Sequence, residues 1–197
     1  MSLLPILELP HPILRKRARK VRRVDKKLLK LAYDMVDTME QAGGVGLAAN
    51  QVGQLHRLIV IRLPDEEARI YINPEILKRE GEREVEEGCL SVPGYKGYIM
   101  RSVWVRFGAI DHESVTVKFK ADDLLAQALE HEVDHLDGIL YLDHLESHED
   151  LIKIETNPTP EDSEDEGSDD GDASASVDEA QALDIQHEET PASMKVN

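Results

Sequence analysis

The chain has 197 residues, with 40 Asp and Glu against 23 Lys and Arg, a formal net charge of −17 and a single cysteine. One cysteine excludes an internal disulfide, which agrees with a reducing compartment. No apolar run reaches the roughly 18 residues of a membrane span, and no charged and apolar signal segment opens the sequence. We therefore expect a cytoplasmic protein without membrane contact.

The negative charge is concentrated in the last part of the sequence. From residue 155 onward, fourteen acidic residues stand against one lysine, which gives this part about −13 and leaves about −4 for residues 1–154. Such a composition offers too little apolar surface to offset the chain entropy lost on folding. We expect one catalytic domain over residues 1–154 and a disordered acidic tail over residues 155–197.

A basic run, Arg15–Arg23, precedes the first predicted helix. Runs of this kind occur in nucleic-acid-binding proteins and in solvated loops. We favour a solvated loop with no specific nucleic-acid target, and we keep transient contact with ribosomal RNA as the alternative.

The first helix is predicted from Asp25, a suitable N-cap, to Gly43. Its apolar residues recur at helical spacing, at Leu28, Ala32, Met35 and Met39. The segment Gly43–Gly53 follows, and its small residues let the backbone come close to a neighbouring element. Taken alone, this segment is equally consistent with a helix C-cap and core packing.

Five short strands are predicted next, separated by turns. The run Leu58–Ile61 is apolar throughout and indicates a buried strand. The other strands are expected at Ile70–Ile72, Arg83–Glu86, Trp104–Phe107 and Val115–Phe119. Short strands joined by turns favour antiparallel pairing.

A second helix is predicted from about Asp122 to Gly138, with glycine in the C-cap position. Its apolar face should be buried against the sheet, and consists of Leu125, Leu129, Val133 and Leu136. The predicted fold class is α+β, with short, mostly antiparallel strands packed around this central helix, an N-terminal helix and the acidic tail.

The second helix carries His131 and His135 one turn apart, with Glu132 beside the first histidine. Residues four apart lie on one helix face, about 6 Å from each other, so one small cation can bind both rings. Cys89 is the candidate third ligand, and three protein ligands leave a fourth position for water, as in catalytic sites. A second histidine pair, His144 and His148, lacks a carboxylate-bearing motif, and we interpret it as solvated.

Three segments in this order resemble the peptide deformylase family. They are Gly44–Gln51, Glu87–Ser91 and Gln127–His135, which match the patterns Gly-x-Gly-Leu-Ala-Ala-x-Gln, Glu-Gly-Cys-Leu-Ser and Gln-x-x-x-His-Glu-x-x-His. The resemblance extends from about Leu4 to Leu145. It implies a hydrolase that removes the formyl group from the N-terminal formyl-methionine of newly made proteins and releases formate.

Amide hydrolysis requires a carboxylate that takes a proton from the attacking water and returns it to the leaving amine, and Glu132 fits this role. The resemblance implies that the oxyanion is stabilised by the side-chain amide of Gln51 and the backbone N–H of Leu90. It further implies a methionine pocket bordered by Gly44 and Val45, with Gly46 allowing close packing beside it. The helix residues expected to line part of this pocket are Leu125, Ala128 and Leu129.

One cysteine and two histidines ordinarily suggest zinc. Peptide deformylases typically use ferrous iron and also work with nickel or cobalt, and more weakly with zinc. We therefore expect Fe²⁺, held by Cys89, His131 and His135, with zinc, nickel or cobalt as substitutes.

Two positions near the motifs depart from the family pattern. Asn50 stands where many relatives have proline, which we expect to loosen the loop that holds Gln51 slightly. Asp123 stands where the family commonly has glycine, just before the second helix.

Two other classes of protein remain open. A metallopeptidase of the zincin type also uses His-Glu-x-x-His, but commonly takes a downstream third ligand and would need neither Cys89 nor Gln51. In a non-catalytic metal-binding interaction protein, the metal would hold the fold and the tail would be the functional part. We expect a monomer, because no heptad pattern or exposed apolar stripe demands a partner.

Overall fold

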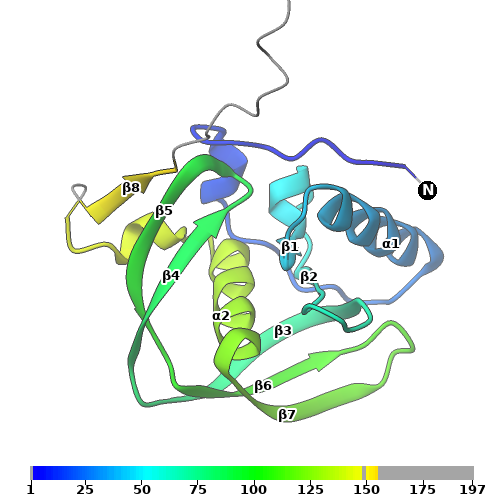
Figure 1. Ribbon diagram of the computed structural model, residues 1–197. Coiled ribbons are helices and arrows are strands. Elements are labelled where there is room, and N and C mark those ends of the chain that lie inside the picture. The colour runs from blue at the N-terminus through cyan, green and yellow to red at the C-terminus, as the bar shows by residue number, and fades with distance from the viewer. Residues whose placement is uncertain (1, 148–149, 155–197) are drawn as a thin grey trace, which may run out of the picture. The chain divides into compact units, whose positions relative to one another are not determined.

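The computed structural model describes residues 2–147 and 150–154, and within them it is an α+β structure (Figure 1). Two α-helices and two antiparallel sheets form it, as expected for the fold class. No helix in these residues is long and apolar enough to cross a membrane. His148 lies outside the described residues, and so does the tail predicted to begin at residue 155.

The larger sheet has five strands in the order β1-β2-β3-β6-β7. Its strands are β1 (Gly46–Ala48), β2 (Leu58–Ile61), β3 (Arg69–Glu80), β6 (Trp104–Ile110) and β7 (Thr116–Asp122). The smaller sheet has the order β4-β5-β8, with β4 (Arg83–Cys89), β5 (Val92–Arg101) and β8 (Leu151–Lys153). Three short 3₁₀ helices complete the described elements: η1 (Pro12–Arg15), η2 (Ala49–Val52) and η3 (Tyr141–His144).

The strand β2 shows why the helices lie where they do. Leu58 and Val60 pack with α1 (Lys26–Gln41), whereas Ile59 and Ile61 pack with α2 (Asp123–Asp137). Because successive side chains of a strand point to opposite faces, a strand covered on both faces must be apolar at every position. The continuous apolar run of β2 is therefore explained by one helix on each face of the sheet.

Both predicted helices are confirmed. The side chain of Asp25 caps α1 by accepting a hydrogen bond from the Leu28 N–H at 2.9 Å. The helix α2 ends at Gly138, which has a left-handed φ of 78°. Of its predicted apolar face, Leu129, Val133 and Leu136 are buried with residues of the larger sheet, and Leu125 is half-buried against the same core. The place of α2 beside the sheet is seen in Figure 1.

The first residue of α2, Asp123, is one of the two positions expected to depart from the family pattern. Asp123 has a φ of 45°, in the left-handed region that glycine occupies without strain. A non-glycine residue in this conformation costs on the order of 1 kcal/mol. The glycine common in the family would relieve this strain.

The strands differ from the sequence-based expectation mainly in length. The strand predicted at Ile70–Ile72 continues to Glu80 through Pro74, and the register of β3 against β6 shifts between Ile72 and Glu75, across this proline. A proline lacks the N–H for a regular ladder, so it is tolerated at such an irregularity. The strands β1, β5 and β8 were not predicted, because β1 and β8 are short and Pro93, Gly94 and Gly97 interrupt the pattern of β5.

Candidate metal centre

The structure brings together the three side chains predicted as metal ligands. Cys89 ends β4, while His131 and His135 come from successive turns of α2, and one ligand atom of each lies within 4.8 Å of the others. The Cys89 Sγ is 3.1 Å from Nε2 of His135. A tetrahedral ion bound at about 2.0–2.3 Å requires donor atoms in this range of separation.

A tight connection between β4 and β5 presents the thiol. The pairing of these strands shifts register between Gly88 and Cys89, so that Cys89 pairs with Val92 across a very short turn. The backbone N–H of Ser91 points to the sulfur at 3.4 Å, and Nε2 of Gln51 does so at 3.6 Å. The sulfur is therefore fixed by its own loop and by η2.

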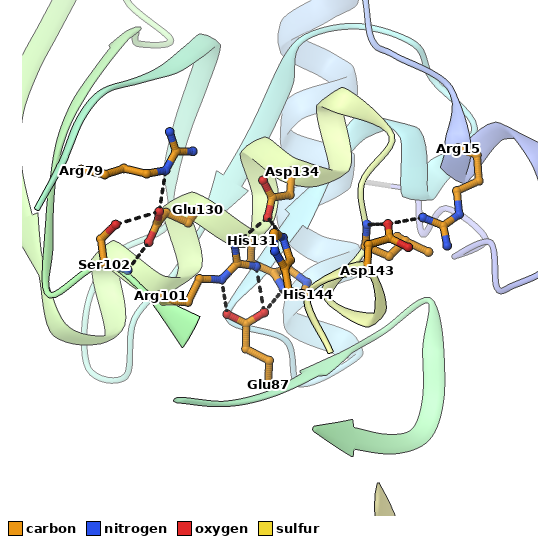
Figure 2. A network of polar contacts seen from close by, with 11 residues as sticks. Arg15, Arg79, Glu87, Arg101, Ser102, Glu130, His131, Asp134, Asp143 and His144 are labelled. Carbon is orange, nitrogen blue, oxygen red and sulfur yellow. Dashed lines mark hydrogen bonds and ion pairs between the residues drawn. The ribbon is translucent and has the colours of Figure 1, made fainter. Parts of the chain in front are cut away.

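A buried ion network orients His131 (Figure 2). Its Nδ1 lies 2.8 Å from Oε2 of Glu87, which leaves Nε2 as the ring atom available to a metal. Arg101 donates to both carboxylate oxygens of Glu87, at 2.8 and 3.1 Å, and to Asp134 at 2.6 Å. Burial opposes ionisation of Glu87, but its hydrogen bonds with His131 and Arg101 outweigh burial and lower its pKa to about 2.

His144 is exposed, in agreement with its interpretation as a solvated residue, and it also contacts the same network. Its Nε2 lies 2.9 Å from Oδ2 of Asp134, the carboxylate that also binds Arg101 (Figure 2). The spacing of His144 in the sequence gave no sign of this contact, because its partner is on a different element.

His135 is held in place by a hydrogen bond to its backbone carbonyl. Its carbonyl accepts a hydrogen bond from Nδ2 of Asn50 in η2, and both residues are buried. The amide of Asn50 thus ties η2 to the end of α2, a contact that opposes the expected loosening of this loop. Burial, together with the nearby His131, lowers the pKa of His135 well below its ordinary value. A neutral imidazole is the form that binds metals.

Glu132 is 3% exposed and lies against β1. Burial has the largest effect on this carboxyl and raises its pKa to about 7. A Cβ atom on Gly46 would lie only 2.9 Å from Cγ and Cδ of Glu132. The prediction that Gly46 allows close packing next to the site is thus confirmed.

A cavity of about 450 Å³ opens at these residues. Nine of the predicted site residues line it: Gly44, Val45, Gly46, Gln51, Cys89, Leu90, Ala128, His131 and Glu132. Leu125 and Leu129 are not among its lining residues and pack instead in the core beneath α2. The prediction placed them both in the pocket and on the buried face, and the structure has them only on the buried face.

The helix contributes Leu124 and Gln127 to the cavity in place of these leucines. Gln127 is four and Leu124 is seven positions before His131, and residues at these spacings share one helix face. Helical periodicity could therefore have identified both residues. The side chain of Gln127 donates to the Glu86 carbonyl at 2.9 Å and links α2 to β4. The cavity is also lined by Pro93, Tyr95 and Ile154, which the sequence did not indicate.

Gln51 and Leu90, the residues expected to stabilise an oxyanion, border the cavity on the side of the thiol. Oε1 of Gln51 accepts from the Ala48 N–H at 2.8 Å, and this fixes the orientation of the amide. Its Nε2 then points to Ser91 Oγ, at 3.2 Å, and to the thiol. The Gln51 N–H₂ group is therefore a fixed donor at the edge of the site.

An N-terminal strap, residues 4–9, connects the two segments that hold Gln51 and Cys89. The Leu7 N–H donates to the Gln51 carbonyl at 2.7 Å, and the Leu9 N–H donates to the Ser91 carbonyl at 3.0 Å. The Leu4 N–H donates to Thr38 of α1 at 3.0 Å. The strap thus holds η2, the thiol loop and α1 together.

A thiol and two imidazoles around one point, with a buried carboxylate and a fixed amide donor beside them, define a metal-dependent hydrolase. The sequence profile of the polypeptide deformylase family matches residues 3–151. The chain is 50% identical to a peptide deformylase of Dehalococcoides mccartyi over 155 residues, which are 78% of this chain and 93% of that protein.

Solved structures agree with this match. A peptide deformylase from Legionella pneumophila superposes with a TM-score of 0.71 at 43% identity, over 73% of this chain and 86% of that one. The enzyme from Synechococcus elongatus, solved in complex with actinonin, gives 0.72 at 37% identity, over 75% and 81%. The chain belongs to the polypeptide deformylase family, whose members are enzymes that remove N-formyl groups from newly made peptides.

Proposed function

We propose that the chain deformylates the N-terminal formyl-methionine of new proteins with Cys89, His131 and His135 holding one Fe²⁺. One observation carries this proposal: the three donor atoms converge within 4.8 Å of one another, and Cys89, His131 and Glu132 line a cavity of about 450 Å³. Amide hydrolysis needs these parts together.

The residues fit a divalent transition metal. One sulfur and two imidazole nitrogens suit a borderline cation, and the lowered pKa of His135 keeps one ring neutral. The network of Glu87 and Arg101 fixes the other ring. When bound, such an ion supplies Lewis acidity and activates water near neutral pH. The family favours Fe²⁺, with nickel, cobalt or zinc as substitutes.

Glu132 moves the proton in this proposal. Its carboxylate takes a proton from the attacking water and passes it to the nitrogen of the leaving peptide, so that formate and a free amine result. A pKa of about 7 matches this exchange near neutral pH. The amide of Gln51 and the backbone N–H of Leu90 stabilise the charge that develops on the formyl oxygen, with each donor contributing about 3 kcal/mol.

The free edges of two strands border the cavity. The strand β1 ends the larger sheet, β4 ends the smaller one, and residues of both line the cavity. An extended peptide placed between two such edges pairs its backbone with them irrespective of its sequence. The methionine side chain then lies near Gly44, Val45 and Ala128, with Leu124 completing an apolar surface.

We extend the proposal to the setting of the enzyme. It acts in the cytoplasm as a monomer on nascent chains, with transient contact to the ribosome. Residues 1–154 form the catalytic domain, with α2 as its central metal-binding helix. The acidic segment 155–197 takes no part in the chemistry.

An anaerobic assay tests the function. Formyl-Met peptides and acetyl-Met peptides are offered to the same metal-analysed preparation, and formate release is measured. We expect formate only from the formyl peptide, with about one iron per chain, and loss of activity in air through oxidation of the ion or the thiolate. Full activity with zinc and none with iron would contradict the metal assignment.

The zincin class is tested by Cys89→Ala. The deformylase assignment predicts loss of bound metal and of turnover, because one of three ligands is removed. If metal-dependent peptide cleavage within the chain persists in this variant, the site belongs to a zincin-type peptidase instead.

A further inference from the structure

The basic run found in the sequence takes on a defined shape in the structure. Residues 15–30 contain ten Lys and Arg and one acidic residue, Asp25, and all ten basic side chains are exposed. Four of the ten form ion pairs, namely Arg15 with Asp143, Arg17 with Asp137, Lys20 with Glu75 and Lys30 with Asp34. The other six have no acidic partner among the described residues: Lys16, Arg19, Arg22, Arg23, Lys26 and Lys27.

Three of these six cations, Arg22, Arg23 and Lys27, border a hollow of about 440 Å³ beside the start of α1. The charged residues around it are Lys20, Arg22, Arg23, Asp25, Lys27, Lys30 and Asp34, together with His56. A second hollow of about 380 Å³ shares Lys20, Arg22 and His56 with the first and adds Arg19. We call the two together the basic groove. It shares no lining residue with the cavity of the metal centre.

The backbone under the basic groove is fixed. Arg19 forms a parallel bridge with His56, and its carbonyl accepts from the Arg57 N–H at 2.8 Å. Val21 exchanges two hydrogen bonds with the side chain of Asn73, at 2.8 and 2.9 Å. A solvated loop needs no such anchoring. The backbone that carries Arg19, Arg22 and their neighbours is therefore anchored, which lowers the entropy lost when this segment binds a ligand.

We propose that the basic groove binds the phosphate backbone of RNA. Unpaired Lys and Arg gathered at the basic groove complement the negative charges of a polyphosphate chain, whose counterions are released on binding. A membrane surface fits less well, because binding at a bilayer also needs inserted apolar side chains, and residues 15–30 expose none of the large hydrophobic residues. The choice of RNA over DNA rests on the proposed function, because nascent chains emerge beside ribosomal RNA.

The net charge of −17 does not prevent this contact. At about 0.1 M salt the Debye length is about 10 Å, so charges farther than this from the basic groove are largely screened there. The local excess of cations then determines which ligands bind.

Binding of the full chain to a fluorescent RNA duplex of arbitrary sequence tests the proposal, with salt varied from about 0.05 to 0.2 M. The variant with Arg22→Gln, Arg23→Gln and Lys27→Gln should bind at least about tenfold more weakly, with a log–log salt slope smaller by about 2–3. The matched control carries Arg106→Gln, Lys118→Gln and Lys120→Gln, which removes three exposed cations from β6 and β7. This control should bind like the wild type.

Equal weakening in both triple variants would overturn the proposal, because net charge alone would then explain binding. Binding to anionic vesicles without binding to RNA would overturn it as well, and equal affinity for the matching DNA duplex would overturn the assignment to RNA. Release of formate from a short formyl-Met peptide should be the same in all three proteins. A wild type that binds RNA but releases no formate would contradict the proposed function and leave the basic groove supported.

Discussion

At the level of single residues, Glu132 is the residue whose role is tested most directly. Replacing it with Gln keeps its size but removes the proton acceptor, so we expect turnover to fall about 10²–10⁴-fold. Metal content should stay at the wild-type level, because Glu132 is not one of the three proposed ligands. Measuring kcat/KM beside the metal content of one preparation checks both. Unchanged turnover would contradict the role of Glu132 as base and favour a non-catalytic metal protein.

Gly46 provides a second test at this scale. Its replacement by Ala would place a Cβ atom 2.9 Å from Cγ and Cδ of Glu132, closer than real contacts allow. The carboxylate must then move, and we expect at least about a tenfold loss of kcat, since small displacements of a catalytic group are costly. Bound metal should be unchanged. Wild-type kcat in Gly46→Ala would show that Glu132 tolerates displacement.

The residues that could be predicted from sequence are those with local spacing. His131, Glu132 and His135 follow from helical spacing, and Cys89 follows from its place among the three ordered motifs. Arg101, which holds Glu87 and Asp134, could not be found this way. Its partners are 14 and 33 residues away, and no local pattern records a contact over such separations.

At the level of elements, the end of α2 depends on Gly138. A Cβ atom there would meet the Arg15 carbonyl oxygen at 2.7 Å, and φ is 78°. We expect Gly138→Ala to lower the free energy of unfolding by about 2–4 kcal/mol, from backbone strain together with this clash. Urea unfolding measures the change.

Gly94→Ala is the matched control for this stability measurement. Its φ is 76°, yet nothing lies within 4 Å of its added Cβ. It should therefore show only the backbone strain, about 1 kcal/mol. Equal losses in the two variants would show that the contact with Arg15 adds nothing.

The helices and strands could be predicted where burial alone determines the pattern of apolar residues. Both helices and the buried strand β2 have a strong apolar periodicity or run. The strand β8 has only three residues, and it forms because β5 offers it an edge, with Tyr95 opposite Lys153. Pairing partners of this kind are determined by the tertiary fold, so a local reading of the sequence does not reveal them.

At the level of the whole molecule, the charge divides the chain into two parts. Ending the chain after Ile154 removes the acidic segment but keeps β8 and the cavity residue Ile154. We expect turnover of a short formyl-Met peptide within about twofold of the full chain, because every proposed site residue remains, and any uniform effect of distant charge is screened at physiological salt. A steady-state assay of both proteins at equal metal content measures this. A large loss would show that the tail contributes to the chemistry.

The N-terminal strap has a practical consequence for work on this protein. Its two backbone hydrogen bonds, from Leu7 and Leu9, reach the segments of Gln51 and Cys89 without using any side chain. Proteolytic trimming of the first nine residues would therefore release both segments at once and yield a purified sample that retains every proposed site residue but has lost their alignment. A removable purification handle placed ahead of Ser2 avoids this hazard, provided that the protease leaves the strap whole.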